Sequence, residues 1–188
     1  MNHNIVIISA HPDDMEIGMG GMVANLVESG AAMTSVVITN GGRSSNPFAL
    51  TEQRMAEIRR EEALRAAGVL GVKDMFFCDE PDAADAVDTT AVTRKLVEIL
   101  TRLRPTEVYT LDEELDRHPT HRLVGKLARE SILEAGIVLS CGIWAYEIWG
   151  PSQPGTALST LTAMWPRRWP LSRKIAVRWP RYPMQKEY

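Results

Sequence analysis

Two short segments of this 188-residue sequence combine histidine and aspartate at spacings that suit catalysis. The first is His11-Pro12-Asp13-Asp14, and the second runs from Asp116 to Arg122 and contains two further histidines. An imidazole and a carboxylate from one segment, with an imidazole from the other, would provide the three ligands of an open catalytic zinc site. Adjacent Asp13 and Asp14 cannot point the same way, so one can face the metal while the other acts as a general base on water.

Each segment also has a simpler interpretation. The first fits a helix-entry turn in which Asp13 or Asp14 caps the following helix. The second fits a loop with two solvated histidines at positions 118 and 121. The chemical interpretation is favoured because both segments directly follow predicted strands, and ligands of parallel sheets bind at the carboxyl ends of strands.

The elements that must position these segments follow from the hydrophobic pattern. Strands are predicted from short apolar or β-branched runs, at Ile5–Ile8, Thr34–Thr39, Asp74–Cys78, Glu107–Leu111 and Ile143–Ile148. Helices are predicted from apolar spacing and end signals, at Met22–Glu28, Thr51–Ala67, Thr89–Leu103 and His121–Ala135. This alternation predicts an α/β fold with a Rossmann-like, mostly parallel sheet and helices on both faces.

The residues around both segments resemble a known family. The stretch from Ala10 to Asp14, followed by Glu16 and glycines at 18, 20 and 21, is similar to the first signature of the PIG-L/LmbE-like zinc-dependent de-N-acetylases. The stretch from His118 to Arg122 resembles the second signature. Further similar stretches are Thr39–Gly42, Arg59–Val72 and Tyr146–Trp149. The resemblance covers residues 4 to about 154 and identifies an N-acetylglucosaminyl deacetylase type of protein.

The resemblance implies a reaction and a metal. Members of this family remove the acetyl group from an N-acetylated sugar, commonly an N-acetylglucosamine conjugate, and release acetate and a free amine. By resemblance, the zinc ligands are His11, Asp14 and His121. Another divalent metal such as Fe²⁺ is the alternative to zinc.

The resemblance also implies roles around the metal. Asp13 corresponds to the general base, and His118 to the residue that stabilises the oxyanion or protonates the leaving amine. Arg59 and, by a looser alignment, Asp82 correspond to residues that contact the substrate. The family often has aspartate where Thr120 stands, so we expect weaker support of the metal ligands here.

Three other functional readings compete with an active deacetylase. An inactive or damaged homologue would keep metal or sugar binding without turnover. A different metal-dependent amidohydrolase or esterase would use the same site on another substrate. A dinucleotide site is disfavoured because the glycines at 18, 20 and 21 do not have the GxGxxG spacing.

Length and composition predict one soluble, cytoplasmic domain. The chain is long enough for its own core, its two cysteines lack CxxC spacing, and no apolar run approaches the length of a membrane helix. We expect a small-molecule substrate as partner and neither nucleic acid nor membrane; assembly with further copies of the chain is left open.

The net charge of −3 conceals two compositions. Residues 1–154 hold 14 basic and 23 acidic residues, whereas residues 155–188 hold seven basic residues, one acidic residue and three tryptophans. We therefore divide the chain into a de-N-acetylase-like domain, 1–154, and an atypical basic tail, 155–188.

Three interpretations of the tail remain. It resembles a basic aromatic arm for nucleic acid or anionic lipid, or a disordered terminus. Tryptophan and methionine each have a single codon, so the neighbouring reading frame is partly fixed, and that frame permits an alanine-rich amphipathic helix like the family's own ending. We therefore favour an out-of-frame reading from about Leu158 onward.

Overall fold

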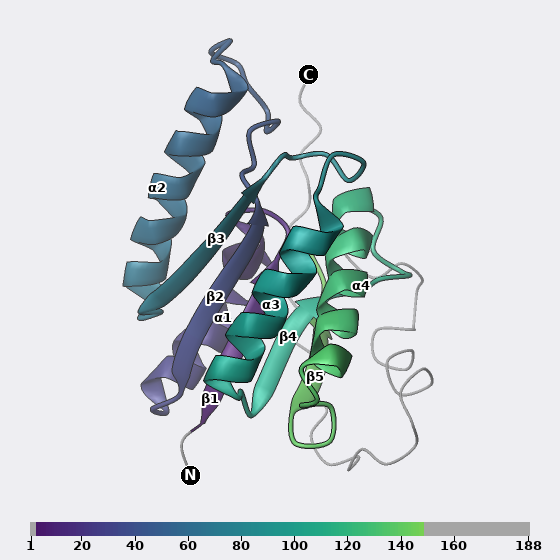
Figure 1. Ribbon diagram of the computed structural model, residues 1–188. Coiled ribbons are helices and arrows are strands. Elements are labelled where there is room, and N and C mark those ends of the chain that lie inside the picture. The colour runs from purple at the N-terminus through teal and green to yellow at the C-terminus, as the bar shows by residue number, and fades with distance from the viewer. Residues whose placement is uncertain (1–2, 149–188) are drawn as a thin grey trace.

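Strands and helices alternate along the chain in the computed structural model, which describes residues 3–148 (Figure 1). The basic tail, its boundary at residue 154 and the three interpretations of it lie outside the described residues. No helix among residues 3–148 is both long enough and apolar enough to cross a membrane.

The strands form one parallel sheet in the order β3-β2-β1-β4-β5. Their bounds are β1 Asn4–Ser9, β2 Ala32–Thr39, β3 Asp74–Glu80, β4 Glu107–Leu111 and β5 Gly142–Tyr146. The β-branched run of β1 lies at the centre, where Ile5 pairs with Met33 of β2 and with Glu107 of β4. Every residue of β1 after Asn4 is buried, as expected for a strand covered on both faces.

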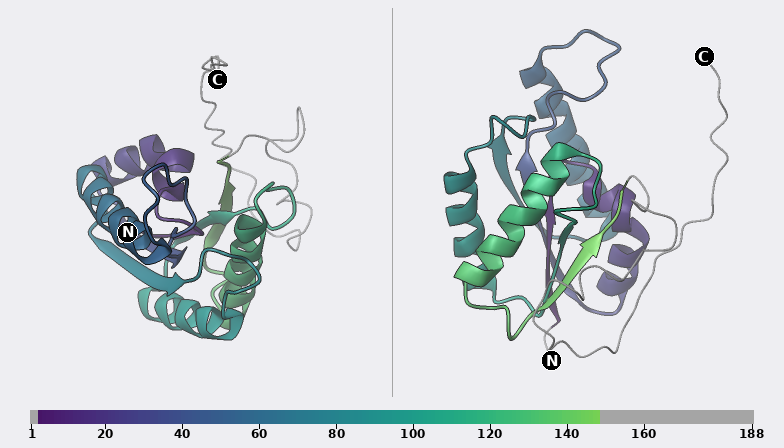
Figure 2. Two further views of the ribbon diagram at one scale, coloured as in Figure 1. Left: turned by 90° about the horizontal axis from the view of Figure 1, so that it is seen from above. Right: turned by 90° about the vertical axis from the view of Figure 1, so that its right-hand side faces the viewer.

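Four helices cover the two faces of the sheet. Their bounds are α1 Asp14–Glu28, α2 Glu52–Leu70, α3 Thr89–Leu103 and α4 Pro119–Glu134. Helices α1 and α2 lie on one face, and α3 and α4 lie on the other (Figures 1 and 2). The predicted α/β architecture is therefore confirmed, and the sheet is entirely parallel among the described residues.

Several predicted element boundaries were wrong. Strand β2 begins two residues earlier than predicted, β3 ends two residues later, and α2 ends three residues later. Helix α1 begins at Asp14 rather than Met22, because the glycine-rich stretch is helical and Gly18 packs against the ring of Tyr146. The low helix propensity of this stretch is consistent with a kink at Met19, whose φ of −149° is not helical. Helix α4 begins two residues before His121, and β5 ends at Tyr146, two residues before the predicted end.

The strand order determines where a ligand can bind. From β1 the chain moves outward to β2 and β3, and it then returns to the other side of β1 to form β4 and β5. The loops after β1 and β4 therefore lead to helices on opposite faces of the sheet, and parallel sheets generally bind ligands at such a point. The two histidine segments occupy these two loops.

Candidate metal centre

The loop after β1 is held by the carboxylate of Asp14. Its Oδ2 atom accepts hydrogen bonds from the backbone N–H groups of Ala10 and His11, each at 2.8 Å. The carbonyl of Ala10 accepts in turn from the hydroxyl and the backbone N–H of Thr39 at the end of β2. These bonds fix the direction in which the His11 ring leaves the strand.

Helix α4 positions the second pair of histidines. His118 is its N-cap residue, and the following proline at the first helical position fits a helix start. Asp116 accepts a hydrogen bond from the backbone N–H of His118 at 2.8 Å and lies 3.0 Å from Nδ1 of His121. Gly125 lets α4 approach β4 closely, since a Cβ atom there would collide with the carbonyl oxygen of Leu111.

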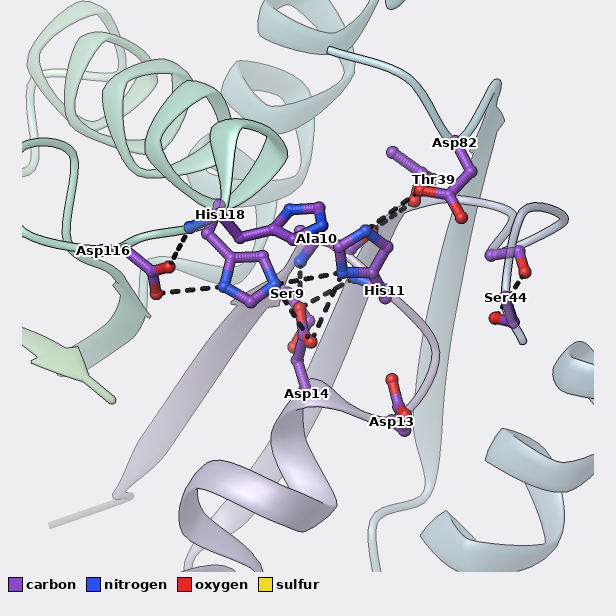
Figure 3. A network of polar contacts seen from close by, with 12 residues as sticks. Ser9, Ala10, His11, Asp13, Asp14, Thr39, Ser44, Asp82, Asp116 and His118 are labelled. Carbon is purple, nitrogen blue, oxygen red and sulfur yellow. Dashed lines mark hydrogen bonds and ion pairs between the residues drawn. The ribbon is translucent and has the colours of Figure 1, made fainter. Parts of the chain in front are cut away.

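Three electron-pair donors meet where the two loops face each other (Figure 3). Nδ1 of His11 lies 3.1 Å from Nε2 of His121, and Oδ1 of Asp14 lies 3.5 Å from both nitrogens. Tetrahedral zinc with bonds of about 2.0–2.1 Å needs ligand atoms about 3.3 Å apart. The side chains therefore fit a metal ion without rearrangement.

The hydrogen bonds on the far side of each ring strengthen this fit. An ionised carboxylate only accepts, so Nε2 of His11 donates to Asp82 at 3.0 Å and Nδ1 of His121 donates to Asp116. The nitrogens that face each other are then free to present lone pairs. Three lone-pair donors in contact require a cation between them, either a proton or a metal.

The charges of the site favour such a cation. Burial disfavours a charged ring at His11, but Asp14 and Asp82 outweigh it and raise the pKa of His11 to about 9. Burial also lowers the pKa of His121, but the carboxylates of Asp116 and Asp14 outweigh this effect and raise the pKa of His121 to about 9. Burial opposes ionisation of Asp14 as well, yet the two imidazoles hold its pKa well below the usual range.

His118 offers a second set of ligands. The imidazoles of His11, His118 and His121 have ligand atoms within 4.8 Å of one another, so these three could also hold a metal. The set that contains Asp14 is the more compact one. Nδ1 of His118 is buried without a hydrogen-bond partner, and burial together with the two neighbouring rings lowers the pKa of this histidine.

Asp13 stands apart from the ligand cluster. It lies to one side of Asp14 (Figure 3), its side chain is 48% exposed, and its Oδ1 lies 2.6 Å from Nη2 of Arg59 on α2. Arg59 also donates to the hydroxyl of Ser44. The structure therefore brings the three proposed ligands together with His118 beside them. Asp13 and Arg59 form a pair next to this cluster, and Asp82 contacts His11 at its edge.

The simpler interpretations of the two segments hold only in part. Asp13 occupies the N-cap position of α1, but its side chain makes no capping hydrogen bond, and Asp14 bonds backward to the loop rather than to the helix. His121 is not solvated, since its side chain is 1% exposed. Both segments begin their helices and also contact each other through His11, Asp14 and His121.

Two residues of the site were not assigned a role from the sequence. Asp116 was visible within the second segment, and its position two residues before the first histidine was the available signal. Glu16 lies on α1 with Oε1 buried and without a hydrogen-bond partner. Burial and the charges of Asp13 and Asp14 raise the pKa of Glu16 to about 7, although Arg59 and a backbone hydrogen bond act against this rise.

The PIG-L family profile, described as GlcNAc-PI de-N-acetylase, matches residues 6–132. This match spans both histidine segments and most of the sheet. The chain belongs to the PIG-L family. The diacetylchitobiose deacetylase of Thermococcus kodakarensis is 32% identical over 135 residues, which cover 71% of this chain and 50% of that protein.

Two further similar proteins extend the comparison. The solved structure of the N,N'-diacetylchitobiose deacetylase of Pyrococcus horikoshii has a TM-score of 0.66 and 28% identity, and the match covers 80% of this chain and 58% of that one. The 4-oxalmesaconate hydratase of Pseudomonas putida is 29% identical over 182 residues, 87% of this chain and 69% of the hydratase. This chain thus spans only about half of the length of the two deacetylases.

The family resemblance implied weaker support of the metal ligands at one position. Thr120, where the resemblance implied an aspartate, is buried next to His121 in the chain. The imidazole of His121 nevertheless keeps a carboxylate partner, because Asp116 occupies its Nδ1. The missing carboxylate at residue 120 therefore leaves this ring supported.

Proposed function

We propose that this chain is a metal-dependent N-deacetylase that hydrolyses the acetamide of an N-acetylated sugar. The observation that carries the proposal is the compact triangle of His11 Nδ1, Asp14 Oδ1 and His121 Nε2, with the separate carboxylate of Asp13 beside it. The deacetylases among its relatives support the substrate class. Two imidazoles and one carboxylate suit zinc, and ferrous iron is the alternative.

A metal held by these side chains supplies Lewis acidity, which lowers the pKa of water and polarises an amide carbonyl. Asp13 accepts the proton of the attacking water, because its carboxylate is exposed and does not belong to the triangle. His118 has a lowered pKa and an unpartnered ring nitrogen, so a neutral imidazole can donate a hydrogen bond to the developing oxyanion. Arg59 contacts the substrate from α2.

The test is acetate release from N,N'-diacetylchitobiose and other N-acetylglucosamine conjugates, with metal content measured on the same samples. Asp13→Asn is expected to lower kcat by about 10²–10⁴-fold while the metal remains bound. Asp85→Asn changes an exposed aspartate on the loop between β3 and α3, and this control is expected to retain activity. Bound metal without turnover would favour the inactive homologue, and no bound metal would contradict the site.

Hydration of a carbon–carbon double bond is the second candidate reaction. It is favoured by the hydratase relative, whose alignment covers 87% of this chain. Asp13 would accept a proton from water in this reaction as well. Loss of the conjugated absorbance of 4-oxalmesaconate, without acetate release from any N-acetylated sugar, would select the hydratase.

A further inference from the structure

Asp82 lies at the metal centre although its strand is two positions away from β1. It follows the edge strand β3, and the loop that carries it passes over the carboxyl end of β2. The backbone N–H of Asn40 donates to the carbonyl of Glu80 at 2.9 Å, which ties the ends of β2 and β3 together. The backbone N–H of Ala83 donates to the carbonyl of Pro81 at 2.8 Å, so the chain turns at Asp82.

Both carboxylate oxygens of Asp82 are engaged within the protein. Oδ1 lies 3.0 Å from Nε2 of His11, and Oδ2 accepts from the backbone N–H of Arg43 at 3.2 Å. The side chain is only 10% exposed. The Asp82 carboxylate therefore binds the His11 imidazole and the backbone N–H of Arg43, and it exposes little surface that a sugar could contact.

The contact has a counterpart on the other ligand. Asp82 binds the far nitrogen of His11 as Asp116 binds the far nitrogen of His121, at 3.0 Å in both cases. Each carboxylate selects the tautomer whose second nitrogen faces Asp14. Metal-bound histidines generally have such a carboxylate or carbonyl partner, and its loss weakens metal affinity.

We propose that Asp82 is a positioning residue for the metal ligand His11, and not the substrate contact that the family resemblance implies. This inference rests on the proposed metal centre. The Asp82 carboxylate fixes the ring plane and the tautomer of His11, so that Nδ1 meets the metal. Its effect on the reaction is therefore exerted through His11.

Zinc affinity, measured by competition with a chromophoric chelator, tests this role. Asp82→Ala is expected to weaken zinc binding by about 10–100-fold. Asp82→Asn is expected to lose less, because an amide oxygen still accepts the N–H of His11, and it carries the test if the alanine variant does not fold. Asp85→Asn on the same loop is the matched control, with affinity equal to that of the unaltered chain.

Kinetics at saturating zinc provide the second readout. A positioning role predicts that KM for the N-acetylated sugar stays unchanged in Asp82→Asn, and that the visible spectrum of the cobalt-substituted protein shifts. Unchanged zinc affinity with a raised KM would overturn the inference and support a sugar contact. If the unaltered chain binds no zinc, the metal centre fails as well; if all variants bind zinc equally well, only the role of Asp82 fails.

Discussion

Arg59 and Asp13 form an ion pair that joins α2 to the start of α1, with Nη2 of Arg59 2.6 Å from Oδ1 of Asp13. The side chain of Arg59 is largely buried, and its guanidinium packs closely against Gly41. Gly41 has a φ of +67°, and a Cβ atom there would lie 2.9 Å from Cδ of Pro12 and 3.2 Å from Nε of Arg59. The turn after β2 therefore needs glycine so that Arg59 can reach the proposed base.

Replacement of Arg59 is expected to impair the base without removing the metal. Arg59→Met should lower kcat by about 10²-fold, because Asp13 loses the partner that orients it. Arg59→Lys should restore part of this loss, since a single ammonium keeps the charge but not the planar fork. Metal content should equal that of the unaltered chain. A rise in KM at constant kcat would show instead that Arg59 serves only the substrate.

The two histidines of α4 should separate metal binding from turnover. His121→Ala removes a nitrogen of the compact triangle, so we expect the purified protein to lose its metal. His118→Ala should retain the metal and lose about 10²–10³-fold in kcat, as expected for an oxyanion donor. Metal analysis and acetate release on both variants decide the matter. Loss of metal in His118→Ala would favour the all-histidine ligand set.

The two cysteines should make stability fall at alkaline pH. Burial raises the pKa of Cys78 to about 11 and that of Cys141 to about 12, from an ordinary value of 9.0. Folded thiols therefore stay protonated at pH 8 and should react slowly with a thiol reagent until urea unfolds the chain. Their contribution to stability is complete below pH 9 and is lost as pH rises towards 12. Rapid labelling of the native protein at pH 8 would contradict this expectation.

The sequence was sufficient for most of the fold and for bringing the two histidine segments together. The β-branched runs of β1 and β2 could be identified because a strand buried on both faces needs apolar residues throughout. The two histidine segments could be paired because the carboxyl ends of parallel strands meet at one edge of the sheet, whereas the choice of His121 as the ligand came from the family resemblance. The ligand roles themselves remain predictions until a metal is measured.

The parts that escaped prediction depend on contacts between distant segments. The contact of Asp82 with His11 requires that the loop after an edge strand pass over β2, and no local pattern indicates that path. The start of α1 was missed because its glycines have low helix propensity, which the packing of Gly18 under β5 overrides. Tertiary packing decided both cases.

That packing of α1 against β5 gives a matched pair of stability variants. Tyr146 is buried, and its hydroxyl lies 2.9 Å from Oγ of Ser9, the last residue of β1 before the segment that carries His11. A Cβ atom on Gly18 would lie 2.5 Å from Cδ2 of this ring and 3.3 Å from the carbonyl of Glu147. Gly18→Ala should therefore lower the free energy of unfolding by about 1–3 kcal/mol.

Gly21 on the same helix supplies the control. It is exposed, and a Cβ atom there meets nothing within 4 Å. Gly21→Ala should raise the free energy of unfolding by about 0.5–1 kcal/mol, because alanine loses less backbone entropy in a helix than glycine does. Urea denaturation of both variants, with the slope m held in common, measures the difference. Equal urea midpoints for the two variants would mean that α1 does not pack against Tyr146. The contact of Tyr146 with Ser9 would then not depend on Gly18.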